Sequence, residues 1–165
     1  MRLRQISWLP VIIMMLVIYF FSSKPAVNSG EDSMIIANGI LDIYEDIADV
    51  QFEEAARIES LGFVDHVVRK AAHFTEYAIL AGTLILHFYI RNKKRKKLIL
   101  YPIILSAMYA ATDEFHQLFV PGRSCEIKDV LLDTAGAATG ALLCYFILRL
   151  LKRRGKSKLD AAATE

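Results

Sequence analysis

Four stretches of the chain are apolar over about the length that a helix needs to cross a bilayer, which is roughly 20 residues. They run over residues 6–23, 71–90, 98–120 and 130–148. The first contains no charged residue, whereas each of the others contains at least one acidic residue. None alternates polar and apolar residues as a barrel strand would, and lipid requires that the backbone satisfy its own hydrogen bonds. The pattern therefore predicts an all-α polytopic membrane protein with four transmembrane helices.

The first apolar stretch has a second interpretation. Arg2 and Arg4, followed by an apolar run, are also typical of a secretory signal. The run is long for such a signal, however, and residues 22–27 contain no clean cleavage site of small residues. We therefore expect a retained helix and a single membrane domain over residues 1–165.

The segment between the first two spans, residues 24–70, is predicted to form a helical loop outside the membrane. Its apolar residues recur at helical spacing, with acidic residues between them. These apolar residues are Ile36, Ile40, Ile43, Ile47 and Val50. An amphipathic helix of this kind lies on the membrane surface, on the bundle, or only against its own loop, and the sequence leaves the choice open. A second short helix is expected over residues 51–60, ended by Gly62.

The distribution of charge predicts how the spans are oriented. Twenty Lys and Arg against eighteen Asp and Glu give a net charge of +2, which does not indicate a nucleic-acid binder. Fourteen of the twenty basic residues lie before the first span, within residues 91–97, or after residue 148. In a four-span bundle these places share one side, so the positive-inside rule puts both termini in the cytoplasm. Residues 24–70 and 121–129 then lie outside.

Ionisable and polar residues of three spans are predicted to meet at one depth near the outer face. These residues are Arg69, Lys70, His73, Glu76, Asp113, Glu114, His116, Gln117, Arg123, Asp129 and Asp133. A charge near the centre of a membrane helix costs on the order of 2.5–3.5 kcal/mol on insertion scales, so these groups must face inward and pair. Gly136 and Gly140, at G-x-x-x-G spacing, would let a partner helix approach closely.

The residue types in this group support several kinds of chemistry. Glu76, Asp113, His73 and His116 are candidates for acid–base catalysis, because buried carboxylates beside histidines can exchange protons. Cations suited to holding a phosphate or carboxylate are Arg69, Lys70 and Arg123. The remaining candidates for ligand binding are Glu114, Gln117, Asp129 and Asp133. The four catalytic candidates would also serve as ligands if a metal is present. A polar zipper that only holds the helices together is a further alternative.

The same residues form three motifs that together resemble the VanZ-like family of bacterial membrane proteins. The motifs are Arg69-Lys70-x-x-His73-Phe74-x-Glu76-Tyr77, Asp113-Glu114-x-His116-Gln117-x-Phe119-x-Pro121-Gly122-Arg123 and Asp129-x-x-x-Asp133-x-x-Gly136-x-x-x-Gly140. The resemblance covers residues 6–151. It implies a protein of the bacterial cytoplasmic membrane, in a family named after an accessory protein that gives resistance to the glycopeptide teicoplanin.

Teicoplanin acts at lipid-linked cell-wall precursors outside the membrane. The resemblance therefore implies that the partners are membrane lipids, a lipid-linked cell-wall precursor or a glycopeptide. It does not distinguish a membrane enzyme or metal-dependent hydrolase from a non-catalytic binder of head groups. No cofactor is indicated. Cys125 and Cys144 are not expected to pair, because one lies in a predicted loop and the other within a span.

Overall fold

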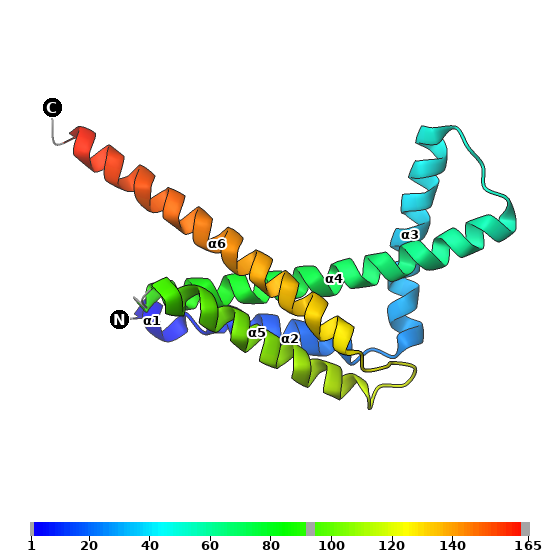
Figure 1. Cartoon of the computed structure of the whole chain (residues 1–165), viewed down its shortest axis with the longest axis horizontal. Helices are drawn as coiled ribbons and strands as arrows, with labels where there is room; N and C mark the ends of the chain where they lie inside the picture. Colours follow the sequence, from blue (N-terminus) through cyan, green and yellow to red (C-terminus); the bar gives the residue numbers. More distant parts are fainter. Residues whose placement is uncertain (1, 92–94, 163–165) are drawn as a thin grey trace.

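The computed structural model describes residues 2–91 and 95–162, and within these ranges it contains helices and connecting turns but no strand. The all-α prediction is thus confirmed. The helices are α1 (Arg2–Ile6), α2 (Leu9–Ser22), α3 (Ala26–Ala48), α4 (Glu54–Ile90), α5 (Arg95–Gln117) and α6 (Ile127–Ala162). Helices α2, α4, α5 and α6 form an elongated bundle, and α3 runs across α4 beyond one end of it (Figure 1).

Three helical segments are long and apolar enough to cross a membrane: Arg4–Ser22, Lys97–Gln117 and Ile127–Arg154. They coincide with three of the four predicted spans. The fourth predicted span, residues 71–90, lies within α4, which is not among the three. Its apolar stretch is interrupted by His73, Glu76 and His87, and each of these lowers its mean hydropathy.

Helix α4 is the centre of the bundle, because it contacts every other described helix and packs most extensively against α6. Tyr77, Leu80 and Ile85 on α4 are almost completely buried. Small residues face them from the neighbouring helices, including Ala110 on α5 and Ala137 on α6. The core is therefore built around a single helix whose apolar half the other helices surround.

The contact between α4 and α6 depends on two glycines. A Cβ atom at Gly136 would lie 2.3 Å from the carbonyl oxygen of Phe74, and one at Gly140 would lie 2.0 Å from that of Ala78. No side chain fits at either position without moving the backbone. The close approach predicted from the G-x-x-x-G spacing is therefore present, and it brings the start of α6 against α4.

The first span begins with a break in the helix. Residues 7 and 8 form a turn between α1 and α2, and Pro10 occupies the first turn of α2. Proline lacks the N–H that would continue a helix from residue 6, and its fixed φ favours a helix start. The Ser7 hydroxyl donates instead to the carbonyl of Arg4 at 2.9 Å. Val11 and Ile18 on α2 belong to the core of the bundle.

The segment outside the apolar bundle differs from the sequence-based expectation. Helix α4 starts at Glu54 and runs through Gly62 without interruption, so the separate helix expected over residues 51–60 is wrong. A glycine lowers helix stability by about 1 kcal/mol relative to alanine but does not by itself end a helix that tertiary contacts support. Both cysteines are free, as expected, with Cys125 exposed in the turn after α5.

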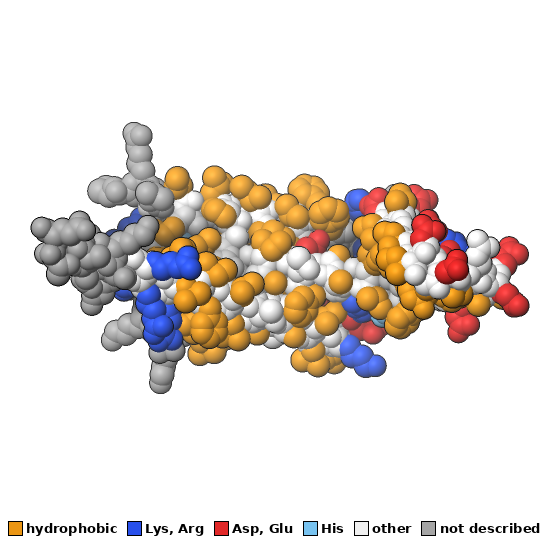
Figure 2. All heavy atoms as spheres, turned by 90° about the horizontal axis from the view of Figure 1, so that it is seen from above, with side chains coloured by type: hydrophobic (Ala, Val, Ile, Leu, Met, Phe, Trp, Pro, Cys, Tyr) orange, Lys and Arg blue, Asp and Glu red, His pale blue; other side chains and the backbone are white. Residues whose placement is uncertain are grey.

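Charged side chains separate along the bundle (Figure 2). Lys and Arg gather at one end, Asp and Glu gather at the other together with some Lys and Arg, and hydrophobic side chains cover much of the surface between. The acidic end is the one where α5 ends and α6 begins, and it is also the end that α3 crosses (Figure 1).

Candidate functional site

The acidic end of the bundle contains a group of buried and half-buried polar residues, which we call the polar cluster. Its members come from α4, α5, the turn after α5, and α6: Arg69, Lys70, His73, Glu76, Asp113, Glu114, Gln117, Arg123, Asp129 and Asp133. Asp113, Glu114, Gln117 and Asp133 are each less than 5 % exposed. Helical spacing explains the grouping, because Arg69, His73 and Glu76 lie on one stripe of α4.

Asp113 occupies the centre of the polar cluster. Its Oδ2 accepts a hydrogen bond from the Ser22 hydroxyl of α2 at 2.8 Å and a longer one from the Gln117 side-chain amide at 3.5 Å. Asp113 also lies close enough to His73 and Glu76 on α4 to interact with both electrostatically. The carboxylate therefore links three helices.

Two contacts join the start of α6 and the turn before it to the other helices. Lys70 on α4 forms an ion pair with Asp129 on α6. On α5, Glu114 accepts a hydrogen bond at 3.0 Å from the backbone N–H of Glu126 in the turn. These contacts neutralise part of the buried charge and hold the ends of α5 and α6 side by side.

Much of the polar cluster has no such partner. Within the described part of the chain, four buried atoms of its members on the helices lack any hydrogen bond: Arg69 Nε, His73 Nδ1, Glu76 Oε2 and Asp133 Oδ1. The nearest approach is 3.7 Å, between His73 Nδ1 and Glu76 Oε2, which is too long for a hydrogen bond. Arg123 Nε is likewise buried and unpartnered. Buried polar atoms are normally hydrogen-bonded. So many unpartnered atoms in one place favour a ligand site over a network of polar contacts that only holds the helices together.

A cavity of about 180 Å³ opens beside three of these residues, Arg69, His73 and Arg123. Arg69, Lys70 and Arg123 provide the cationic part of its wall, and Glu126 and Asp129 provide the acidic part. His73 contributes an imidazole ring. Lys70 is paired with Asp129 and Arg69 with Asp65, but the Nε atoms of Arg69 and Arg123 have no hydrogen-bond partner in the described chain. Both guanidinium groups therefore retain a donor for a ligand in the cavity. A small anionic group, such as a phosphate, fits this volume and this arrangement of donors.

The turn after α5 brings Arg123 back toward the bundle. Gly122 has a φ of +76°, which L-residues with side chains rarely adopt, and the Arg123 N–H donates to the carbonyl of Val120 at 3.1 Å. Burial, followed by the neighbouring Arg69, lowers the pKa of Arg123, while Asp113 and Glu114 raise it. Two guanidinium groups that repel each other at one cavity are stabilised when an anion lies between them.

His116 takes a different direction from the other candidates. Its ring lies 5.0 Å from that of Tyr19 on α2, centroid to centroid, in a tilted arrangement.

Among the residues that the structure describes, no group of three or more His, Cys, Asp or Glu side chains is arranged to hold a metal ion. His73, Glu76, Asp113 and His116 are therefore not gathered into a metal-binding arrangement there.

Three residues near the site were not singled out from the sequence. Ser22 donates to Asp113 but lies in an uncharged span with no spacing that links it to α5. Asp65 on α4 forms an ion pair with Arg69 at 2.8 Å and accepts a hydrogen bond from Ser33 on α3. His66 on α4 is exposed and also lines the cavity. Asp65 and His66 could have been placed beside the site only by predicting that α4 begins well before residue 71.

The fold and the polar cluster define an all-helical membrane protein with a buried polar site at one end of its bundle. Residues 7–149 match the model of the VanZ/LLP1 family, so the chain belongs to that family, as the resemblance predicted. A search of curated proteins gives no match to this chain, and a search of solved structures gives none either. The family match includes all three motifs and every member of the polar cluster.

Proposed function

We propose that this protein binds the phosphate-bearing head group of an envelope lipid or a lipid-linked cell-wall precursor at the outer face of the cytoplasmic membrane. The head group enters the cavity at the polar cluster, and Arg69 and Arg123 hold its phosphate. By holding such a ligand, the protein lowers susceptibility to glycopeptides of the teicoplanin type. The observation that supports this proposal is the cavity itself, with two unpartnered arginine Nε atoms buried beside it.

The proposed location depends on the orientation of the bundle. Fourteen of the twenty basic residues lie at the end opposite the polar cluster or in the adjoining segments, and positive charge favours the cytoplasmic side. In this proposal α4 crosses as the fourth span. Its polar residues face the bundle interior rather than lipid, which is how membrane helices accommodate ionisable groups. The polar cluster then lies at the depth of the outer head groups.

The orientation is tested by single cysteines in the intact membrane, with Cys125→Ser and Cys144→Ala as the background. We expect a membrane-impermeant maleimide to label Glu45→Cys from outside, and Lys94→Cys or Gly155→Cys only after the membrane is opened. Labelling of Lys94→Cys in intact cells would reverse the orientation and place the cavity at the wrong face.

Binding is tested on the purified protein by native mass spectrometry with phosphatidylglycerol, with a polyprenyl phosphate, and with diacylglycerol as the uncharged comparison. We expect both phosphates to bind and diacylglycerol to bind much more weakly. Arg123→Ala should weaken phosphate binding by roughly tenfold or more, because hydrogen bonds to charged groups contribute about 1.5–3 kcal/mol. Arg123→Lys should recover only part of this loss, because lysine lacks the planar fork.

Lys128→Ala is the matched control, since Lys128 is an exposed cation of the same region that does not line the cavity. Equal binding of diacylglycerol and phosphatidylglycerol would overturn the proposal, and so would unchanged binding by Arg123→Ala. In cells, Arg123→Ala should remove any protection against teicoplanin that the wild-type protein gives, while Lys128→Ala keeps it.

A second candidate function is acid–base catalysis on the same ligand. It is favoured by Glu76, whose buried Oε2 has no hydrogen-bond partner in the described chain and lies 3.7 Å from His73 Nδ1. Of His73, Glu76 and Asp113, only His73 lines the cavity, so His73 would exchange a proton with the substrate. Glu76 and Asp113 would in turn exchange that proton with His73. Glu76→Gln separates the two functions. A binder keeps both phosphate binding and cellular protection in this variant, whereas an enzyme keeps binding and loses protection.

A further inference from the structure

Helix α3 uses one face to pack on α4. Ser33, Ala37 and Leu41 on this face are almost completely buried. The Ser33 hydroxyl donates to Asp65 of α4, and the contact lies beyond the apolar bundle. Because α3 runs across α4 rather than along it (Figure 1), its two flanks face opposite directions along the long axis of the bundle.

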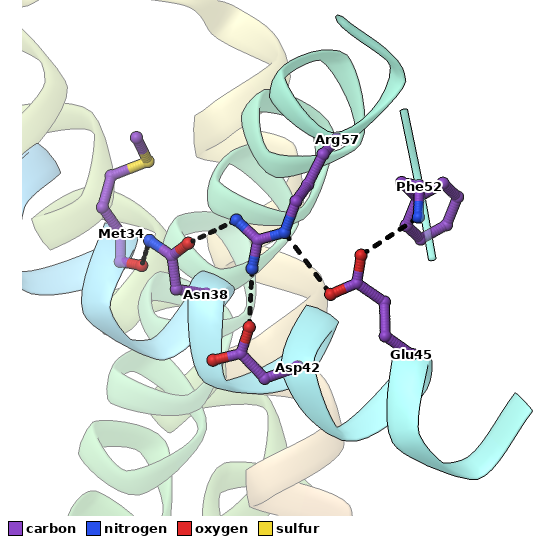
Figure 3. Close-up of polar contacts among 6 residues, drawn as sticks. All are labelled: Met34, Asn38, Asp42, Glu45, Phe52 and Arg57. Carbon is purple, nitrogen blue, oxygen red and sulfur yellow. Dashed lines mark hydrogen bonds and ion pairs between the residues drawn. The ribbon is translucent and has the colours of Figure 1, made fainter. Parts of the chain in front are cut away.

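The flank of α3 that faces away from the bundle is polar (Figure 3). Arg57, near the start of α4, donates to Asp42 at 2.6 Å, to Asn38 at 3.2 Å and to Glu45 at 3.4 Å. Glu45 also accepts a hydrogen bond from the backbone N–H of Phe52 at 3.3 Å. Since Arg57 lies on the part of α4 farthest from the bundle, it identifies the flank of α3 that faces away from the bundle.

The opposite flank of α3 is a stripe of isoleucines, Ile36, Ile40, Ile43 and Ile47. These side chains are between 45 % and 82 % exposed, although each follows the last by one helical turn and together they form a continuous apolar surface. Figure 2 shows hydrophobic side chains on the side of this segment that faces the bundle and acidic side chains beyond them. The stripe therefore faces the level of the apolar surface of the bundle, and the polar flank faces away from it.

We propose that α3 lies in the outer interface of the membrane that the bundle crosses, with the isoleucine stripe inserted among the lipid chains. Amphipathic helices in this position bury their apolar face about 5–10 Å into the boundary between head groups and acyl chains. The polar flank, with Arg57 and its acidic partners, then faces water. The insertion of α3 does not rest on the proposed function, because it uses only α3 and the apolar surface of the bundle; that this interface is the outer one rests on the orientation proposed above.

The charge of α3 indicates how it is held at the membrane. The helix contains five acidic residues and no Lys or Arg. Attraction to anionic lipids therefore contributes nothing, and the apolar surface supplies the driving force. We expect the insertion to persist at high salt and to be at least as strong in zwitterionic bilayers as in anionic ones.

This placement would also fix the turn that holds Arg123. The Ala26 N–H, at the start of α3, donates to the carbonyl of Pro121 at 3.2 Å. Ala26 lines the cavity, and a Cβ at Gly122 would lie 3.1 Å from the Ala26 Cβ. A helix seated in the interface would hold this turn at a constant depth relative to the head groups.

The experiment measures depth with an environment-sensitive fluorophore on single cysteines in the full-length protein. Ile43→Cys and Ile47→Cys report on the stripe, and Asp46→Cys is the matched control on the exposed polar side of the same turn. Cys125→Ser and Cys144→Ala provide the background. The protein is placed at one copy per nanodisc, in lipids with or without bromine on their acyl chains, which quenches fluorophores at chain depth.

We expect brominated lipids to quench the labels at 43 and 47 several-fold more than the label at 46, and aqueous iodide to show the reverse order. Two results would overturn the proposal. Equal iodide quenching at all three positions would mean that the stripe lies in water. Shielding at 43 and 47 that appears only with two copies per disc would mean that a second copy of the chain covers it. Because two stripe positions are used, misplacement of one label does not decide the outcome.

Discussion

Helix α4 has two main packing partners that it contacts in different ways. Against α6 it is joined through Gly136 and Gly140, whose positions leave no space for a side chain beside the α4 backbone. Against α3 it is joined through Leu41, together with ion pairs from Arg57 at the edge. Helices in lipid associate through close backbone contact at small residues, because an apolar side chain gains little free energy when it moves from lipid to a protein interface. Burial of a leucine edged by ion pairs is how helices associate in water.

The change from one kind of contact to the other occurs along a single uninterrupted helix. If these contacts reflect their surroundings, the boundary between lipid and water lies near the polar cluster. The membrane position proposed above for the isoleucine stripe on α3 requires the same boundary. Predictions that separate the two contacts also test where this boundary lies.

The largest effect is expected from Gly140→Ala in the contact between α4 and α6. The new Cβ would lie 2.0 Å from the Ala78 carbonyl oxygen, so the two helices must move apart. Overpacking typically costs about 1–3 kcal/mol in unfolding free energy, and a contact this short with a backbone atom favours the upper end or more. Thermal unfolding in detergent measures it, with Gly82→Ala as the control, since that Cβ would meet the Cys144 Cβ only at 4.0 Å. Equal stability of the two variants would show that the helices are not in backbone contact.

Leu41→Ala should weaken the contact between α3 and α4 and leave the bundle intact. Leu41 is 5 % exposed. Truncation of a buried leucine costs about 2–5 kcal/mol in unfolding free energy, and we expect the lower end because so small a contact can partly close the space left. Hydrogen exchange should show faster exchange in α3 and in the first turns of α4, with unchanged protection in α6. Faster exchange throughout the chain would mean that α3 is part of the same cooperative unit as the bundle.

The sequence predicted the bundle better than it predicted α3 and the start of α4. Hydrophobic period and length were sufficient for three of the four predicted spans, because lipid imposes one solution on a long apolar run. They were not sufficient at Gly62, where local propensity favoured an end and tertiary contact with α3 favours continuation. For the same reason Asp65 looked like one of many loop acids. Its role follows only from a helix that places it one turn before Arg69 and opposite Ser33.

The polar cluster likewise contains contacts that the sequence predicted and contacts that it did not. Helical spacing grouped Arg69, His73 and Glu76 on one stripe, because a single helix determines that arrangement. Contacts between helices that are distant in sequence, such as Ser22 with Asp113, have no local signal. Nor does the orientation of a ring: His116 faces Tyr19, which its spacing from Asp113 did not indicate.

Arg57→Ala should have a smaller effect than Leu41→Ala, because its ion pairs are at the edge of the contact. Asp42 is exposed, Arg57 is about one third exposed, and surface ion pairs contribute roughly 0–1 kcal/mol each. Water screens such pairs, so the difference from wild type should shrink as salt is raised. Local hydrogen exchange of α3 at low and high salt measures this. A difference that does not depend on salt would place Arg57 in surroundings from which water is excluded, and the boundary would then lie farther out.

The smallest expected effect is a gain in stability from Gly62→Ala. Gly62 lies inside α4 in a region that belongs to neither the α6 contact nor the cavity, and a Cβ there would meet no atom within 4 Å. Alanine restricts the unfolded chain and is the better helix former, so the outer part of α4 should become more stable by about 0.5–1 kcal/mol. Exchange of the amides near residue 62 should slow, and phosphatidylglycerol binding should not change. A loss of stability would instead mean that α4 bends or opens at this glycine, and the two packing contacts would then lie on separate helices rather than on one.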